Sequence, residues 1–201
     1  MIKMWHGSKR WTGVPEIRQS KRGKAEAGPG IYLTTSQQRA RSYARGGGCL
    51  VHFELDPKTK FAHEVQLDPA DALQFLECVR LSNRQLLEKD VAYETNEPGK
   101  LRETICAETL ITLMINTNNS HGRTGKDFCD YLVARGVQAG FHRAYGNEDW
   151  IVVHDTSIIK SSRKVYADQL ENYARNYPEV KEQLAQCQQM ELPTQEAALG
   201  R

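Results

Sequence analysis

Residues 28–35, Gly28-Pro29-Gly30-Ile31-Tyr32-Leu33-Thr34-Thr35, form a glycine-rich turn followed by a short aliphatic and aromatic segment. Glycine adopts turn conformations that other residues avoid, whereas β-branched and aromatic residues favour strands. The stretch therefore predicts a strand over residues 31–33 that presents Tyr32. Ser36 follows directly and is a preferred N-cap, which predicts a helix through residue 45.

Four further segments have strand character. Residues 2–6 alternate apolar and polar side chains and stop at Gly7-Ser8, which predicts a strand with His6 at its carboxyl end. Residues 49–55 alternate in the same way. Residues 137–141 and 149–153 read as paired strands with a hairpin-like connection, and Glu148 stands just ahead of the second.

The middle and the tail of the chain are predicted to be mostly helical. Helices are expected from Asp68-Pro69 to about residue 89, from about 100 to 115, and from 125 to 135 with Gly136 at the end. Residues 61–67 read as an extended piece, and residues 9–27 as a long basic loop with one helical turn. Amphipathic helices are expected over 164–177 and 179–190, separated by Pro178. The predicted organisation is a domain over residues 1–162 with a helical insertion at about 68–135, and a C-terminal helical extension over 163–201.

The composition limits the class of protein. A chain of 201 residues fits one domain with an appendage, and it contains no apolar run near the ~20 residues that a membrane helix needs. The first ten residues lack the apolar core of a signal peptide, so a cytoplasmic location is expected. The five cysteines are scattered and show neither a disulfide framework nor metal-ligand spacing, so no metal is expected.

Four of the motifs, in this order, resemble the His-Tyr-Glu pattern of the ADP-ribosyltransferase superfamily of the diphtheria-toxin and PARP type. They are His6-Gly7-Ser8, Gly30-Ile31-Tyr32-Leu33-Thr34, Ala40-Arg41-Ser42-Tyr43-Ala44, and Glu148 ahead of Ile151-Val152-Val153. The likeness covers the N-terminal quarter and about residues 132–160. It implies an α+β fold with a split β-sheet core of two packed sheets, carrying the helical insertion and the C-terminal helices.

The resemblance also implies the chemistry. The chain would be a transferase that uses NAD+ as co-substrate and releases nicotinamide, with Glu148, His6 and Tyr32 as catalytic residues. Contacts to NAD+ are expected from these residues and from Gly7, Ser8, Gly30 and Tyr43. A carboxylate on the ribose 2'-hydroxyl would stabilise the positive charge that develops as the bond to nicotinamide breaks, and an aromatic ring would stack on nicotinamide. Packing alone would explain Tyr43 about as well.

The position of the glutamate departs from the family pattern. Family members commonly have it at the place that Trp150 occupies here, two residues later. Because side chains of a strand alternate with a period of two, Glu148 and Trp150 share a face and Asp149 points away. Glu148 is therefore the first choice for the catalytic carboxylate, and Asp149 is the alternative. Trp5, Trp11 and Trp150 are expected to be packing residues, although Trp11 could stack on a base.

The charge pattern bears on the acceptor. The net charge is only +2, but basic residues gather between residues 9 and 45. Such a patch attracts phosphate backbones, so a nucleic-acid acceptor, either RNA or single-stranded DNA, is predicted. The residues expected to bind it are Lys9, Arg10, Arg18, Lys21, Arg22 and Lys24. The alternatives are a solvated basic face, contacts to the pyrophosphate of NAD+, or a protein acceptor.

The biological role is expected from the resemblance alone. Small bacterial and phage members of the superfamily are often toxins of toxin-antitoxin or antiviral defence systems, so toxicity and a neutralising antitoxin protein are expected. The apolar stripe of the tail could dock on such a partner, or on the protein's own core. Competing hypotheses are a non-catalytic module of the same fold that binds nucleic acid or nucleotide, and an RNA 2'-phosphotransferase.

Overall fold

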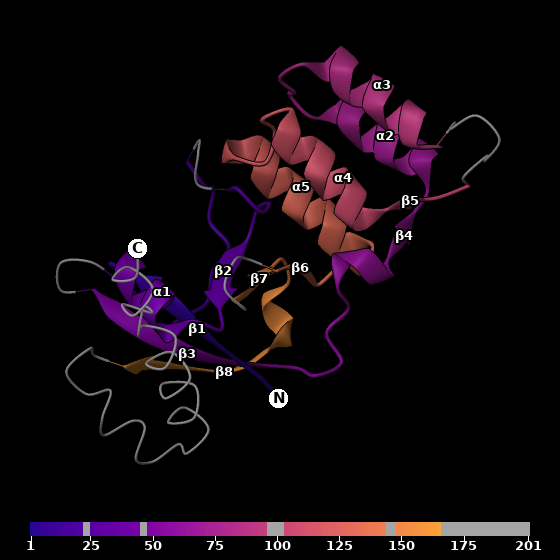
Figure 1. The fold of residues 1–201 in the computed structure, drawn as a ribbon. Coiled ribbons are helices and arrows are strands. Elements are labelled where there is room, and N and C mark those ends of the chain that lie inside the picture. Colours follow the sequence, from indigo (N-terminus) through magenta and orange to yellow (C-terminus); the bar gives the residue numbers. More distant parts are fainter. Residues whose placement is uncertain (22–24, 45–47, 96–102, 144–147, 166–201) are drawn as a thin grey trace, which may run out of the picture.

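The computed structural model describes residues 1–21, 25–44, 48–95, 103–143 and 148–165 (Figure 1). The chain is α+β. Its strands are β1 (Ile2–Ser8), β2 (Ile31–Thr34), β3 (Cys49–Leu55), β4 (Gln66–Leu67), β5 (Ile105–Cys106), β6 (Ala139–Arg143), β7 (Asp149–Val153) and β8 (Ile159–Val165). Its α-helices are α1 (Gln37–Tyr43), α2 (Pro69–Cys78), α3 (Arg84–Thr95), α4 (Ala107–Asn116) and α5 (Gly122–Ala134), and two short 3-10 helices are η1 (Ala62–Glu64) and η2 (Thr156–Ile158).

The main sheet has six strands in the order β6-β7-β2-β1-β3-β8, and neighbouring strands are antiparallel. β1 pairs with β3 along its whole length, but it pairs with β2 only through Trp5 and Thr34. The sheet therefore consists of two three-stranded halves that are joined at one residue pair, rather than two separate sheets. Apolar side chains of both halves, such as Phe53, Leu33 and Val153, fill one hydrophobic core.

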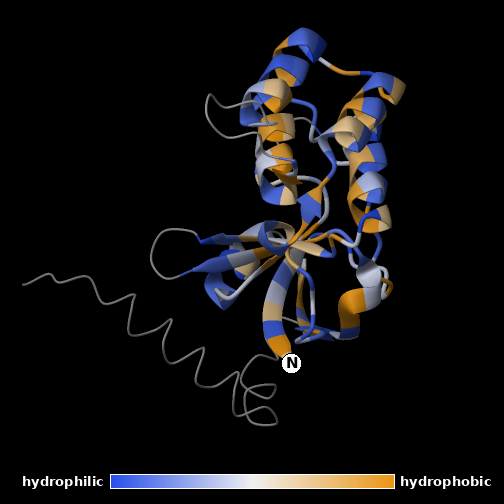
Figure 2. Cartoon of the chain, turned by 90° about the vertical axis from the view of Figure 1, so that its right-hand side faces the viewer, coloured by the Kyte–Doolittle hydropathy of each residue, from blue (hydrophilic) through white to orange (hydrophobic). Residues whose placement is uncertain are grey.

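Helices α2 to α5 form a second body with its own core. Figures 1 and 2 both place them together on one side of the sheet. Their core includes Leu76, Leu87, Leu110, Met114 and Phe128, all fully buried. The two-stranded sheet of β4 and β5 belongs to this part of the chain. Thus the predicted helical middle forms a compact unit beside the sheet.

The predicted helix from Asp68-Pro69 to about residue 89 is wrong in its middle, because α2 and α3 are separate. The start is as expected, since the Asp68 carboxylate accepts a hydrogen bond from the backbone N–H of Ala70. The chain then turns at Asn83, whose φ of 52° is incompatible with a right-handed helix. The side chain of Asn119, between α4 and α5, bonds both the N–H and the C=O of Ser82. These bonds replace the helical ones, so the break is stabilised from a distant part of the chain.

Two other boundaries differ from the predictions. The helix expected from about residue 100 starts at Ala107, because Ile105 and Cys106 pair with β4 instead. Residues 163–165, expected to belong to the C-terminal helical extension, continue β8 and pair with β3. The helical turn expected in residues 9–27 is not present in the described part of that loop. The tail helices proper lie outside the described residues.

α1 is the helix that matters most for the site. Ser36 caps it as predicted, by accepting a hydrogen bond from the N–H of Arg39. Ala40 and Ala44 pack with Trp5, Leu50 and Val165 on the outer face of β1, β3 and β8. The helix approaches β1 so closely that a Cβ on Gly7 would lie 1.7 Å from the carbonyl oxygen of Ala40. Gly7 is thus required for this packing.

Candidate functional site

A cleft of about 350 Å³ opens between β1, β2, β7 and α1. Four residues that the sequence assigns to an NAD+ site line it together: His6, Gly7, Tyr32 and Tyr43. They come from β1, β2 and α1, so the fold unites segments that are far apart in the chain. The volume lies within the range of roughly 300–1,000 Å³ that is typical of small-molecule sites.

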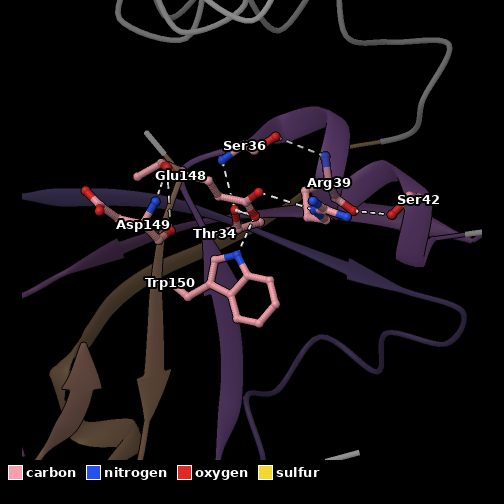
Figure 3. Close-up of polar contacts among 8 residues, drawn as sticks. Thr34, Ser36, Arg39, Ser42, Glu148, Asp149 and Trp150 are labelled. Carbon is pink, nitrogen blue, oxygen red and sulfur yellow. Dashed lines mark hydrogen bonds and ion pairs between the residues drawn. The ribbon is translucent and has the colours of Figure 1, made fainter. Parts of the chain in front are cut away.

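Glu148 is not itself one of the residues that line this cleft, but its carboxylate contacts three that do, and only 7% of the residue is exposed. Its Oε1 accepts a hydrogen bond from the hydroxyl of Thr34 at 2.7 Å and another from the indole N–H of Trp150. Its Oε2 accepts from Nε of Arg39 at 3.2 Å. All three donors line the cleft. Figure 3 shows their contacts with the carboxylate of Glu148. A charged group is buried at little cost only when it is paired and hydrogen-bonded in this way.

The alternative carboxylate, Asp149, points elsewhere. It accepts from Arg143 at 3.4 Å, and that arginine is largely exposed. The backbone of Asp149 pairs with Thr35, which fixes the start of β7 beside the end of β2. Thr34 and Trp150 face each other in the register of these two strands. The alternation of side chains thus puts Glu148 on the same side as Trp150, which lines the cleft, and Asp149 on the other side.

His6 is half-buried and held by a backbone group. Its Nδ1 lies 2.8 Å from the carbonyl oxygen of Tyr32. Because a carbonyl can only accept, Nδ1 must carry a proton, and in the neutral ring Nε2 is an acceptor. Burial lowers the pKa of His6, and the bond to Tyr32 opposes that shift. A neutral imidazole with an acceptor atom at Nε2 suits the recognition of a hydroxyl group. Trp11 and Phe53 pack near the ring.

Tyr32 presents its ring to the cleft while its hydroxyl ties down the preceding turn. The hydroxyl accepts from the N–H of Ala27 and donates to the carbonyl of Gly28, both at 2.8 Å. Burial raises the pKa of Tyr32 to about 12, so the hydroxyl keeps its proton at neutral pH and remains a donor. The ring of Trp150 packs edge-on against that of Tyr32, with 6.4 Å between centroids.

Three further side chains hold the same turn, and all three come from outside β1 and β2. Ser120 donates to the carbonyl of Ala25 at 3.1 Å, and His142 lies 3.2 Å from the carbonyl of Ala27. The buried His154 contacts the carbonyl of Pro29 at 2.7 Å through Nδ1. Ser120 belongs to the segment between α4 and α5, so the helical unit contributes to the position of Tyr32.

The other residues assigned to NAD+ binding, Tyr43, Gly30 and Ser8, differ in exposure and in the contacts that they make. Tyr43 is 55% exposed at the rim of the cleft, which argues against a core role. Gly30 lies against β7: its φ is +153°, and a Cβ would come within 2.5 Å of the carbonyl oxygen of Val153, so glycine is required at this position for packing. The Ser8 hydroxyl bonds the backbone N–H and C=O of Arg10 and thereby closes a local turn.

The basic residues assigned to nucleic acid are only partly brought together. Lys9 lines the cleft, and Arg10 and Lys21 are exposed. Arg18 pairs with Glu16 at 2.9 Å, and Arg22 and Lys24 lie outside the described residues. The cleft also contains an acidic residue, Glu26, so its described charges are mixed.

Three residues of the site are absent from the sequence-based assignment: Thr34, Arg39 and Trp150. Trp150 was expected to be a packing residue, whereas its indole N–H contacts Glu148. The spacing of two between Glu148 and Trp150 was a usable signal, because it placed both on one face. Nothing in the sequence pairs Arg39 with Glu148, which are 109 residues apart.

Comparisons with known proteins add little. No family model and no curated protein matches the sequence. A crystal structure of an anti-CRISPR protein can be superposed with a TM-score of 0.34 and 13% sequence identity, over 82% of this chain and 95% of that one. A likeness this weak carries no argument about fold or function. Among the described residues, none of the helices has both the length and the apolar character that crossing a membrane requires.

Proposed function

We propose that the protein is an NAD+-dependent mono-ADP-ribosyltransferase with a His-Tyr-Glu site. One observation carries this proposal: His6, Tyr32 and the donors around a buried Glu148 converge on one cleft from strands that are distant in sequence. A buried carboxylate beside an aromatic ring is what the cleavage of a glycosidic bond to nicotinamide needs. The resemblance to the superfamily supports the same reading.

The residues can be given roles. Glu148 would bind the ribose 2'-hydroxyl and stabilise the charge that develops at the anomeric carbon. His6 would accept a hydrogen bond from a ribose hydroxyl at Nε2, and Tyr32 would stack on the nicotinamide ring. The bond between the anomeric carbon and nicotinamide breaks, and nicotinamide leaves as a neutral molecule with the bonding electron pair. The acceptor forms the new bond to that carbon and gives up a proton.

The acceptor is proposed to be nucleic acid, either RNA or single-stranded DNA. Lys9 within the cleft and Arg10 and Lys21 nearby in sequence would attract a phosphate backbone, and the exposed Tyr43 offers a stacking surface. Protein is the competing acceptor class. A role as a toxin with a neutralising partner rests on the resemblance alone.

Nicotinamide release from NAD+ tests the function. The wild-type protein is expected to release it, and Glu148→Gln should reduce the rate by about a hundredfold or more, because the charge that stabilises the transition state is lost. Asp149→Asn is the matched control, since it removes the neighbouring carboxylate that points away, and it should retain activity. Equal loss in both variants would contradict the assignment of Glu148.

Labelled NAD+ identifies the acceptor. Parallel incubations with RNA, single-stranded DNA and cell-lysate protein are expected to label a nucleic acid. Label in protein alone would exclude the nucleic-acid proposal and leave the transferase activity in place. Tight binding of nucleic acid without any nicotinamide release would instead favour a non-catalytic module.

A further inference from the structure

The three side chains that donate hydrogen bonds to Glu148 differ in how far the surrounding structure fixes their orientation. Thr34 lies in β2 and is buried. Its hydroxyl accepts a hydrogen bond from the N–H of Ser36 at 2.9 Å, so its single proton is directed to Oε1 of Glu148. Ser36 in turn caps α1 through Arg39 N–H. The orientation of the Thr34 hydroxyl is therefore set by the first turn of a helix.

Trp150 supplies the second donor to the same oxygen. An indole N–H can only donate, and here it donates to Oε1 from a ring that lies beside Tyr32. Because Trp150 is opposite Thr34 in the sheet register, both donors come from paired strands. Oε1 is thus held on two sides by the framework of the sheet.

The other oxygen, Oε2, has a different partner. Among the described residues only Arg39 contacts it, at 3.2 Å, through a side chain that is 52% exposed. An ion pair with an exposed arginine contributes little free energy and is readily exchanged. Oε2 is therefore the atom of Glu148 that can take a new hydrogen-bond partner without disturbing the strands.

We propose that Thr34 and Trp150 are positioning residues that hold Oε1, so that Oε2 is the atom that engages the ribose hydroxyl, with Arg39 as its replaceable partner. This proposal rests on the proposed function and deepens it. The physical reason is preorganisation: a carboxylate whose orientation is fixed before the substrate binds does not have to be ordered in the transition state.

Steady-state kinetics of nicotinamide release test the positioning role. Thr34→Val keeps the shape of the side chain and removes its hydroxyl donor, and Trp150→Phe keeps an aromatic ring and removes the N–H donor. We expect each to lower kcat by about tenfold or more and to change KM for NAD+ by less than about threefold, because the lost contact orients a catalytic group. Thr34→Ser restores the hydroxyl and should recover most of kcat. Arg39→Gln should lower kcat by less than about fivefold.

Two outcomes would overturn the assignment. The first is a kcat within threefold of wild type in both donor-deletion variants. The second is a Thr34→Ser variant as slow as Thr34→Val, which would show that the hydroxyl is not the relevant group. Melting temperatures of all variants, with Asp149→Asn as the matched neighbour, separate a slow folded enzyme from an unfolded one.

The NMR signal of the Trp150 indole N–H tests the contact independently of activity. The signal is identified by its loss in Trp150→Phe. We expect it to shift in Glu148→Gln and to stay in place in Asp149→Asn, because only the first variant changes its acceptor. An unchanged signal in Glu148→Gln would refute the contact between Trp150 and Glu148, even if the wild-type protein releases nicotinamide. A shifted signal without nicotinamide release by the wild-type protein would instead refute the proposed function. The catalytic role of Thr34 and Trp150 would then be refuted as well.

Discussion

Lowering the pH from about 7 to about 4.5 should destabilise the protein through His154, which holds the turn before Tyr32. The residue is 2% exposed, and its Nδ1 contacts the carbonyl of Pro29 at 2.7 Å. The pKa of His154 is lowered from 6.5 to about 4, mainly by burial; the hydrogen bond to the carbonyl of Pro29 opposes the shift, and the neighbouring His142 contributes to it. In the unfolded chain the imidazole gains a proton below about pH 6.5, whereas the folded protein keeps it neutral.

The sign and the size of the effect follow from this difference. Above pH 6.5 both states carry a neutral ring, so His154 adds no pH dependence. Below it the unfolded state binds the proton first, and the free energy of unfolding falls until the pH reaches about 4. One pKa unit corresponds to about 1.4 kcal/mol, so the full loss is roughly 3 kcal/mol. Most of this decrease in the free energy of unfolding should already have occurred at about pH 4.5.

Urea unfolding at several pH values measures this effect. His154→Asn is the comparison, because its amide N–H can still donate to the carbonyl of Pro29 but does not titrate in this range. The variant will be less stable at pH 7, since a smaller side chain leaves a cavity. Its stability should nevertheless fall less steeply than that of the wild type between about pH 6.5 and 4.5. Parallel losses in the two proteins would refute the reasoning, because His6 and the carboxylates titrate in both.

Further predictions concern the packing that shapes the site and the helical unit. Gly7→Ala should cost about 2 kcal/mol or more and lower activity, because its methyl group would overlap the backbone of Ala40 and displace α1. Gly13→Ala is the matched control: its φ of +92° makes alanine strained by about 1–2 kcal/mol, but no atom of the described residues lies within 4 Å of the new methyl group, so activity should persist. Asn119→Ala should cost about 2–3 kcal/mol in urea unfolding, because it removes the two part-buried bonds that the buried Asn119 side chain makes to Ser82, whereas the exposed Asn116→Ala should be nearly neutral. Ser120→Ala should lower the melting temperature by a few degrees by freeing the carbonyl of Ala25, and an unchanged value would show that this bond is not needed.

Local patterns in the sequence were enough for the elements that build the site. Alternating side chains predicted β1 and β3, and β-branched and aromatic residues after a glycine turn predicted β2. The hairpin-like pattern predicted β6 and β7, and Ser36 predicted the start of α1. The same period of two placed Glu148 on the face of Trp150 and Asp149 on the other, as the structure confirms. These predictions succeed because strand alternation and helix capping depend on residues only a few positions apart.

Contacts between distant parts of the chain could be decided only by the tertiary structure. The break between α2 and α3 depends on Asn119, which lies 37 residues beyond Ser82, so the helical spacing up to residue 89 gave no sign of it. Residues 163–165 were predicted to belong to the helical extension, but in the folded protein they pair with the backbone of β3. Gly7 was expected to contact NAD+, and the structure shows that its missing Cβ also accommodates the backbone of α1.

The site shows the same division. The sequence by itself determined which residue types stand in or directly before three strands: a histidine in β1, a tyrosine in β2 and a glutamate before β7. Only the tertiary structure decided that Thr34, Trp150 and Arg39 surround the glutamate and that two of them hold one of its oxygens. The reason is physical: the side a residue faces is set by the local backbone, but the partner it meets there is set by strand register and helix packing across the whole fold.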